Sequence, residues 1–267
     1  MSRLAEGDLR ALRTYLASAF GLRAEAYRDS FLERRVLPRL EAAGCPSLAA
    51  YLDFLRDHPA EARTLLHKVL VPTTEFFRNP EVFRRLAALL AERREALHWK
   101  VLRLLSAPCS TGEEAYSLAL LLERAAWPGG ILAVDRSLSA LRTLRAARYP
   151  ARLLKPLDRE GLSRYFTVEE GQGLAAPVLR KRVLPVCADL SQGVPGRGFH
   201  VALVRNLFIY LTEEAQERLL REVHRAILPG GLLVLGRVEG LPRGASGLFQ
   251  TVDREGKIFE RKAGSRP

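Results

Sequence analysis

The chain has 267 residues, 48% hydrophobic and 27% charged, a composition typical of a globular protein with one large domain and a smaller one. It has no apolar run that could cross a bilayer, no signal-peptide pattern and no metal-ligand spacing among its 3 Cys and 5 His, so we expect a cytoplasmic protein without membrane insertion or a metal. The net charge of +12 favours an acidic partner, although arginines on solvated helix faces would produce the same excess.

Residues 1–70 are predicted to form a small all-helical domain. Apolar residues recur every three or four positions, with breaks at Gly21, Gly44–Pro46 and His58–Pro59, which indicates roughly four helices. The second helix carries four arginines, most of them on one side. That side either docks an acidic partner or is simply solvated; its residues are Arg28, Arg34, Arg35 and Arg39.

Residues 71–80 interrupt the helical periodicity and are predicted to be a linker. Their sequence, Val-Pro-Thr-Thr-Glu-Phe-Phe-Arg-Asn-Pro, has two adjacent phenylalanines followed by an arginine, whereas one aromatic residue would suffice to anchor a loop. We therefore expect this linker to position a functional group. A helix over residues 81–97 follows it.

After Val101, predicted strands and helices alternate, which is typical of a mainly parallel α/β sheet. The first strand, residues 101–105, leads into the turn Ser106–Ser117. Glu113 and Glu114 lie where this turn becomes a helix, and the helix dipole favours ionised carboxylates there. The turn suits a cationic or amine-bearing ligand, or it is an ordinary N-cap with acidic residues in the first helical turn.

The second strand, residues 131–134, ends in Asp135. Nucleoside-binding α/β folds place the acidic residue that binds the ribose hydroxyls at this position, about twenty residues beyond the first strand–helix turn. A helix over residues 138–148 follows. Residues 149–181 have a weak pattern that predicts loops with a short helix or hairpin.

The remaining chain predicts strands over residues 183–186, 200–204 and 232–235, a helix over 212–228, and an antiparallel pair over 248–252 and 257–261. A parallel sheet that ends in an antiparallel hairpin is the topology of class I S-adenosylmethionine-dependent methyltransferases. The chain also lacks the G-x-G-x-x-G turn that binds a pyrophosphate. An acidic turn without those glycines favours S-adenosylmethionine, which carries an ammonium and a sulfonium.

These motifs resemble one family, the chemotaxis receptor glutamate O-methyltransferases known as CheR. The matching segments occur in family order and cover most of the chain: Thr74-Glu-Phe-Phe-Arg-Asn-Pro-Glu-Val-Phe83, Ser106-Ala-Pro-Cys-Ser-Thr-Gly-Glu-Glu-Ala-Tyr-Ser117, Ala133-Val-Asp135, Arg205-Asn-Leu-Phe-Ile-Tyr210, and Leu228-Pro-Gly-Gly-Leu-Leu-Val-Leu-Gly236 with Glu239.

The resemblance implies a helical domain over 1–70 that docks the receptor, a linker over 71–80 that contributes to the cofactor site, and a methyltransferase domain over 81–267. It implies that Arg78 and Tyr210 lie nearest the transferred methyl group. The residues that it implies around S-adenosylmethionine are Thr74, Arg78, Glu113, Asp135, Asp189, Leu190, Asn206 and Leu207. The product would be S-adenosylhomocysteine.

Three departures from the family pattern concern the cofactor. Pro72 stands where the family usually has Asn, and it has neither an amide side chain nor an N–H group. Asp189 replaces an adenine-side Asn, so it accepts but cannot donate a hydrogen bond. Val204 and Val238 replace small polar residues. Some family members also carry a small β-subdomain that tethers the receptor tail, in the region 149–181, and the weak strand pattern there predicts that this chain lacks one.

We therefore expect a monomeric protein-glutamate O-methyltransferase that modifies the cytoplasmic coiled coil of a chemoreceptor and tunes adaptation in a chemotaxis-like pathway. One alternative is a methyltransferase for RNA or a small molecule, which the net charge supports; the chain lacks the interleaved aromatic and basic residues of a nucleic-acid platform, so we expect no nucleic-acid partner. Another is a non-catalytic S-adenosylmethionine-binding scaffold, which the Pro72 and Asp189 departures support.

Overall fold

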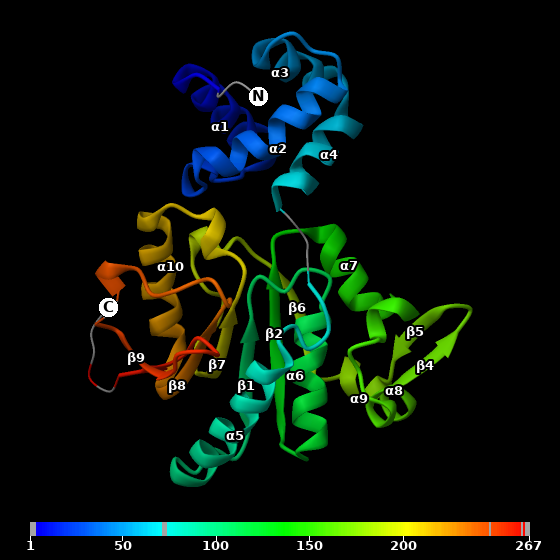
Figure 1. Cartoon of the computed structure of the whole chain (residues 1–267), viewed down its shortest axis with the longest axis vertical. Helices are drawn as coiled ribbons and strands as arrows, with labels where there is room; N and C mark the ends of the chain where they lie inside the picture. The colour runs from blue at the N-terminus through cyan, green and yellow to red at the C-terminus, as the bar shows by residue number, and fades with distance from the viewer. Residues whose placement is uncertain (1–3, 71–73, 246, 263, 265–267) are drawn as a thin grey trace. The chain divides into compact units, whose positions relative to one another are not determined.

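The computed structural model describes residues 4–70, 74–245, 247–262 and 264 (Figure 1). The chain divides into two compact units. The smaller unit comprises Met1–Val71 and Tyr210–Gln216, and the larger comprises Pro72–Ile209 and Glu217–Pro267. Pro72, one of the departures noted in the sequence, lies outside the described residues.

The smaller unit is a bundle of α-helices: α1 (Glu6–Phe20), α2 (Asp29–Ala42), α3 (Leu48–Asp57) and α4 (Pro59–Leu70), with a short 3-10 turn, η1 (Ala24–Ala26). The apolar stripes meet in one core that buries Leu12, Phe31, Tyr51 and Leu65. Gly21 ends α1 in a left-handed conformation (φ 60°) that glycine adopts without strain. The predicted breaks thus fall between the observed helices.

A segment from late in the chain completes this unit. Leu211 forms an antiparallel bridge with Tyr27, and the Arg28 N–H donates to the Tyr210 carbonyl oxygen at 3.0 Å. The Tyr210 ring lies against the Phe31 ring, with centroids 4.6 Å apart. Residues separated by about 180 positions in sequence therefore share one small core.

The larger unit contains a seven-stranded sheet in the order β6-β2-β1-β7-β8-β10-β9. Neighbouring strands from β6 to β8 are parallel, whereas β10 and β9 are antiparallel. The strands are β1 (Leu102–Ser106), β2 (Gly129–Asp135), β6 (Val183–Cys187), β7 (Phe199–Val204), β8 (Ile227–Leu235), β9 (Phe249–Asp253) and β10 (Ile258–Arg261). This confirms the predicted fold class.

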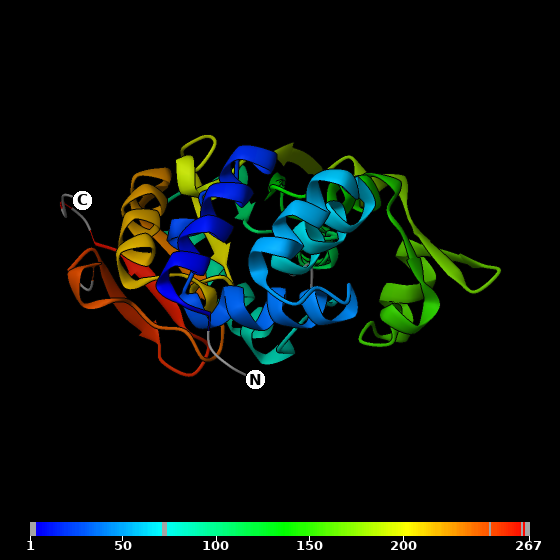
Figure 2. The ribbon, with the colours of Figure 1, turned by 90° about the horizontal axis from the view of Figure 1, so that it is seen from above.

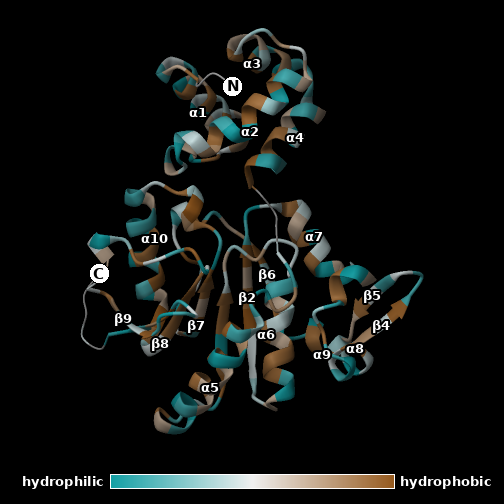
Figure 3. Ribbon diagram, in the orientation of Figure 1, coloured by the Kyte–Doolittle hydropathy of each residue, from teal (hydrophilic) through white to brown (hydrophobic). Residues whose placement is uncertain are grey.

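The helices of this unit are α5 (Pro80–Ala96), α6 (Glu113–Arg124), α7 (Leu138–Ala146) and, from Glu217 onward, α10 (Glu213–Ala226). Its shorter turns are η3 (Leu190–Gln192) and η5 (Arg243–Ala245), and η4 (Phe208–Tyr210) leads from it into the segment of the smaller unit. Apolar residues concentrate along the central strands (Figure 3), where Leu104, Ala202 and Val234 are fully buried. In the described part of the chain, no helix combines the length and the apolarity that a membrane span requires.

Residues 148–182 differ from the prediction. They form a second, three-stranded antiparallel sheet, β3-β5-β4, which projects from the large sheet's body (Figure 2). Its elements are β3 (Arg148–Pro150), η2 (Ala151–Leu154), α8 (Arg159–Tyr165), β4 (Phe166–Glu169), β5 (Gln172–Ala175) and α9 (Pro177–Arg180). The prediction that this chain lacks a β-subdomain is wrong, because strands of three or four residues are too short to show a clear period.

A smaller difference concerns the last crossover. The predicted helix over 212–228 ends at Ala226, and β8 already begins at Ile227. The residues Pro229–Gly231, which follow the predicted helix, belong to the strand, because Ile227 pairs with Phe199 before a register shift restores pairing at Leu232. A Pro-Gly-Gly sequence is compatible with a strand at such an irregularity.

Candidate functional site

The site begins in the turn between β1 and α6. The Ala107 N–H donates to the Leu203 oxygen at 3.0 Å, and the Cys109 N–H donates to the Val134 oxygen at 2.8 Å, so the turn is fixed to the carboxyl ends of β7 and β2. Gly112 has a φ of 100°, and a Cβ atom there would lie 2.6 Å from Leu144 Cγ. The turn therefore requires glycine before α6 begins.

Glu113 is the first residue of α6 and its side chain is buried. Its Oε2 accepts a hydrogen bond from Thr111 Oγ1 at 2.6 Å, and burial raises the pKa of the carboxyl. Among the described side chains, none forms an ion pair with Glu113. A buried carboxylate without a cation, at the carboxyl edge of a parallel sheet, suits a positively charged ligand.

Glu114 differs from its neighbour because it is already paired. Its Oε1 accepts from Ser106 Oγ at 2.7 Å, and its Oε2 lies 3.3 Å from Arg205 Nη1. The side chains of Arg205 and Glu114 are only 2% and 10% exposed. Glu114 therefore belongs to an internal ion pair and is not available to a ligand.

Arg205 follows β7 and connects that ion pair to the linker. Its Nη2 donates to the Arg78 carbonyl oxygen at 2.9 Å and to Asn79 Oδ1 at 2.7 Å. The Phe77 N–H donates to Ser117 Oγ on α6 at 2.8 Å. Arg205 lies in one of the family motifs, but the sequence alone did not predict its role; its place at the end of an apolar strand is the signal that could have indicated a buried ion pair.

The linker itself packs partly into the core. Phe76 is fully buried and meets Tyr149 and Phe166 edge-to-face, whereas the Arg78 side chain is about one third exposed, with Nε 3.8 Å from Glu75 Oε1. Thr74 is half-buried. The two phenylalanines and Arg205 thus fix the backbone of a segment whose arginine side chain stays accessible.

Asp135 ends β2 and connects two turns. Its Oδ2 accepts from the Ser110 N–H and its Oδ1 from the Ser137 N–H, both at 2.8 Å. Burial raises the pKa of this carboxyl, and these backbone hydrogen bonds oppose the shift. Asp135 is therefore a structural element of the turns as well as a candidate for ribose binding.

Asp189 is paired in this structure. It forms an ion pair with Arg136 and accepts the Ser191 N–H at 2.9 Å, which starts η3. Leu190 is the first residue of η3 and is half-buried. Arg136 was not singled out from the sequence, since it is one of many arginines and only the fold brings it to Asp189.

Asn206 and Leu207 lie just beyond β7 and are half-buried. Asn206 has a φ of 60°, and its N–H donates to Glu239 Oε2 at 3.0 Å. Glu239 is buried and also accepts the N–H groups of Phe208 at 2.8 Å and Gly236 at 2.6 Å. This carboxylate fixes the turns after β7 and β8, a role that its sequence position did not predict.

The predicted cofactor residues Thr74, Arg78, Glu113, Asp135, Asp189, Leu190, Asn206 and Leu207 all belong to the larger unit. The hydrogen bonds above connect Asp135 to the turn that precedes Glu113, and Arg78 to Arg205, the residue before Asn206. Tyr210, predicted to act beside Arg78, belongs to the smaller unit, where its ring packs on Phe31.

The four arginines predicted to dock a partner have different environments. Arg39 forms an ion pair with Glu61, Arg28 Nε donates to the Leu211 oxygen at 2.8 Å, and the Arg35 guanidinium lies 5.4 Å from the Phe31 ring centroid. Arg34 is exposed, and its Nε donates to the Ser30 oxygen of its own helix. Arg39 is thus engaged inside the bundle, whereas Arg28 and Arg34 are exposed.

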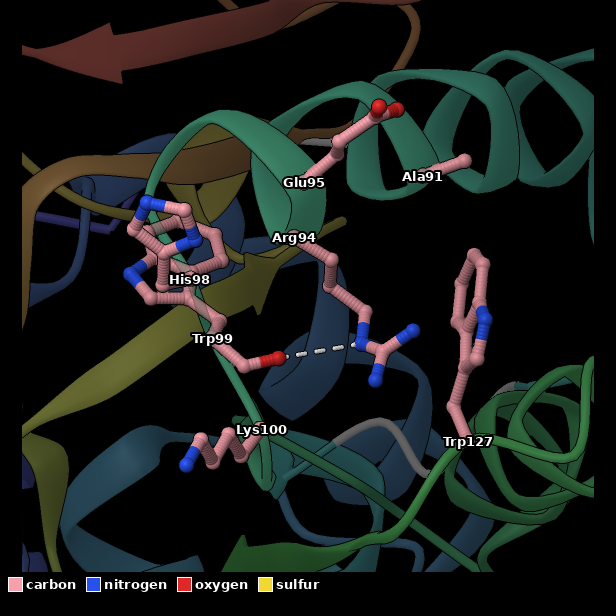
Figure 4. A pocket seen from close by; sticks show the side chains of 7 residues that line it. All are labelled: Ala91, Arg94, Glu95, His98, Trp99, Lys100 and Trp127. Carbon is pink, nitrogen blue, oxygen red and sulfur yellow. Dashed lines mark hydrogen bonds between the residues drawn. The ribbon is translucent and has the colours of Figure 1, made fainter.

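A pocket of about 410 Å³ lies elsewhere, beside the loops that precede β1 and β2. Arg94 reaches across it toward Trp127 and donates to the Trp99 carbonyl oxygen at 3.2 Å (Figure 4). It contains none of the predicted site residues; its lining is Ala91, Arg94, Glu95, His98, Trp99, Lys100 and Trp127. These contacts of Arg94 stabilise the C-terminal end of α5, so Arg94 has a structural role here.

Comparison with known proteins gives two family matches. The model described as CheR methyltransferase, SAM binding domain, matches residues 72–258, and the one described as CheR methyltransferase, all-alpha domain, matches residues 7–70.

Three curated relatives illustrate the similarity. A probable biofilm formation methyltransferase WspC from Pseudomonas putida is 35% identical over 233 residues, which are 85% of this chain and 55% of the relative. An uncharacterized 104.1 kDa protein from Rhodobacter capsulatus is 34% identical over 223 residues, 80% of this chain and 23% of the relative. Chemotaxis protein methyltransferase 2 from Vibrio cholerae is 26% identical over 257 residues, 90% and 88% of the two chains. The chain thus spans about half the length of the first relative and about a quarter of the length of the second.

Proposed function

The chain belongs to the CheR methyltransferase family, and from that membership we propose that it transfers the methyl group of S-adenosylmethionine to glutamate side chains of a chemoreceptor's cytoplasmic coiled coil, forming γ-methyl esters. The observation that carries the proposal is Glu113, a buried carboxylate without a cationic partner in the described chain, at the carboxyl edge of the parallel strands. The wider role would be adaptation in a chemotaxis-like pathway.

The residues present fit the cofactor. Glu113 would bind the ammonium of the aminoacyl group, and Asp135 would accept from the ribose hydroxyls. Asp189 and Leu190 would lie on the adenine side, with Thr74, Asn206 and Leu207 completing the surroundings. When bound, S-adenosylmethionine supplies an electrophilic methyl group on a sulfonium.

The substrate needs little chemical activation. A glutamate carboxylate, with a pKa of about 4.3, is ionised at neutral pH, so no general base is required. Positioning of the carboxylate and exclusion of water would supply most of the rate enhancement. Arg78 would orient the carboxylate by charge-assisted hydrogen bonding, and Tyr210 would fix it with the phenolic O–H.

The direct test is methyl transfer from radiolabelled cofactor to a purified chemoreceptor cytoplasmic fragment. Incorporation that alkali releases as methanol, and that is lost when the acceptor glutamates are replaced by alanine, is the expected result. Labelling of RNA but not of the fragment would favour a nucleic-acid methyltransferase instead. Binding of S-adenosylhomocysteine without transfer to any acceptor would favour a non-catalytic scaffold.

Glu113→Gln should weaken S-adenosylhomocysteine binding by about ten- to hundredfold, because one charge-assisted hydrogen bond is lost. The wild-type affinity should also fall as the pH decreases through the raised pKa of Glu113, since the protonated carboxyl cannot neutralise an ammonium. Titration calorimetry between neutral and mildly acidic pH measures both effects. In Glu113→Gln the affinity should no longer depend on the ionisation of this side chain. If the affinities of wild type and variant fell equally with decreasing pH, the assignment of Glu113 to the ammonium would be contradicted.

Tyr210→Phe should lower kcat by about tenfold while leaving the affinity for S-adenosylhomocysteine unchanged, because only a hydroxyl aimed at the substrate is removed. The packing of the ring on Phe31 is preserved in this variant, so the stability of the bundle should not change. Single-turnover methylation and calorimetry on the same preparation separate the two quantities. Full activity would remove Tyr210 from the mechanism.

Docking of the receptor on the α2 arginines remains part of the proposal. Arg34 and Arg28 are the exposed members, and a glutamate-rich coiled coil would complement them. Arg39 is the natural control, because its charge is already neutralised by Glu61.

A further inference from the structure

Tyr210 stands at the point where the chain passes from the larger unit to the smaller one. Just before it, Glu239 Oε1 of the larger unit accepts the N–H groups of Phe208 at 2.8 Å and Ile209 at 3.4 Å. From Tyr210 to Thr212 the chain bonds instead to the residues that precede α2 in the smaller unit. The side chain proposed to act on the substrate therefore begins a segment that the helical unit holds.

Two backbone hydrogen bonds join this segment to the start of α2. The Arg28 N–H donates to the Tyr210 oxygen at 3.0 Å, and the Thr212 N–H donates to the Ala26 oxygen at 2.9 Å. They lie on either side of the antiparallel bridge described above. Because the two bonds fix both ends of a three-residue stretch, the backbone of Tyr210 is tied to the residue that precedes α2.

The side chain of Arg28 adds a third hydrogen bond to the same segment. Its Nε donates to the Leu211 oxygen at 2.8 Å, although the residue as a whole is exposed. Gln216 Nε2, from α10, donates to the same oxygen at 3.2 Å. A carbonyl oxygen that accepts two hydrogen bonds has both lone pairs engaged, so the peptide group after Leu211 is fixed in orientation.

The ring of Tyr210 is held by aromatic packing on α2. The Phe31 ring centroid lies 4.6 Å from that of Tyr210 and 5.5 Å from that of Tyr27, and Phe31 is fully buried. The phenolic oxygen of Tyr210, by contrast, forms no hydrogen bond with any described residue. The ring is thus fixed by its face, while the O–H group remains available to a substrate carboxylate.

We infer that the start of α2 positions Tyr210 for methyl transfer, with Arg28 acting on the backbone and Phe31 on the ring. Arg28 is then a positioning residue in addition to the docking role proposed for it above. The inference rests on the proposed function, because that function places the Tyr210 hydroxyl at the substrate carboxylate. A displacement of about 1 Å at a reacting group can lower a rate by roughly a hundredfold, so these contacts bear on kcat and not on cofactor affinity.

The test measures kcat and KM for the receptor cytoplasmic fragment with wild type, Arg28→Met, Tyr210→Phe and the double variant. Methionine retains much of the aliphatic length of arginine but removes the donor. Arg63→Met is the control, because Arg63, on α4 of the same unit, is exposed and has no hydrogen bond or ion pair within the described chain. Calorimetry with S-adenosylhomocysteine gives the cofactor affinity, and thermal unfolding checks that each variant folds.

Arg28→Met should lower kcat by about fivefold, whereas its affinity for S-adenosylhomocysteine and the kcat of the control should stay unchanged. In the Tyr210→Phe background the same substitution should change kcat by about twofold at most, because the hydroxyl that it positions is gone. Losses that multiply in the double variant would overturn the inference. So would a higher KM with unchanged kcat, which a docking charge alone would produce, or full activity of Tyr210→Phe.

Hydrogen exchange of the Thr212 amide distinguishes a failure of this inference from a failure of the proposed function. Because that amide bonds to the Ala26 oxygen, Arg28→Met should accelerate its exchange by about fivefold relative to Arg63→Met. The comparison needs no methyl acceptor. If no acceptor is methylated but exchange is faster, the proposed function fails while Arg28 still holds the segment; unchanged exchange would overturn the inference itself.

Discussion

Replacing Arg205 by methionine is expected to lower the free energy of unfolding of the larger unit by about 3–5 kcal/mol, because it leaves the buried Glu114 carboxylate without its cation. The change also removes the donor to the Arg78 carbonyl oxygen and Asn79 Oδ1. Thermal unfolding should therefore occur roughly 10 °C lower. The double variant Arg205→Met, Glu114→Gln should recover part of the loss, since the buried charge is then gone as well.

Arg205→Lys separates the ion pair from the positioning of the linker. Lysine retains the charge beside Glu114 but cannot supply the planar fork that also reaches the linker. We expect most of the stability to remain while kcat falls and the affinity for S-adenosylhomocysteine changes little. If kcat and cofactor affinity fell together in proportion to stability, Arg205 would have only a structural role.

Asp135→Ala should weaken S-adenosylhomocysteine binding by at least a hundredfold, because two charge-assisted hydrogen bonds to the ribose would be lost at about 1.5–3 kcal/mol each. Calorimetry gives the affinity directly. The structure adds a complication, since the same carboxylate accepts the N–H groups of Ser110 and Ser137. A loss of affinity alone therefore does not distinguish ribose binding from disruption of the turns.

An analogue of the product without ribose hydroxyls makes that distinction. If Asp135 acts through the hydroxyls, wild type and Asp135→Ala should bind the analogue with nearly equal affinity. An equally large loss with the analogue would show that Asp135 serves the turns and not the ribose. Thermal unfolding without ligand measures how much the turns contribute to stability.

The positions of the five parallel strands were predictable because each is a mainly apolar segment that polar residues or glycine follow, but their order in the sheet was not. The second sheet was not predictable, because its strands are short and Gly173 interrupts the apolar pattern of β5. The buried faces of those strands gain their contacts from Phe76 and α6, which are distant in sequence. The local sequence pattern does not indicate contacts with residues that are distant in sequence.

In the candidate site, too, local sequence could not predict which polar groups are paired. Glu113 and Glu114 are adjacent and chemically alike, yet one is paired by Arg205, 91 positions later, and the other is not. Asp189 was identified as an acceptor on the adenine side, but its ion pair with Arg136 depends on β2 and β6 being neighbours. Sequence indicated where polar groups gather at the strand ends, and the fold decides which of them remain for a ligand.

The segment that forms the small sheet begins and ends at neighbouring positions in the larger unit. The Ala175 N–H donates to the Ala147 oxygen at 2.9 Å, so the chain that departs after α7 returns beside its own exit before continuing to β6. An insertion whose two ends meet can be exchanged for another without changing the register of the strands that flank it. Grafting this segment between relatives would therefore measure what it contributes to stability and activity while the large sheet stays constant.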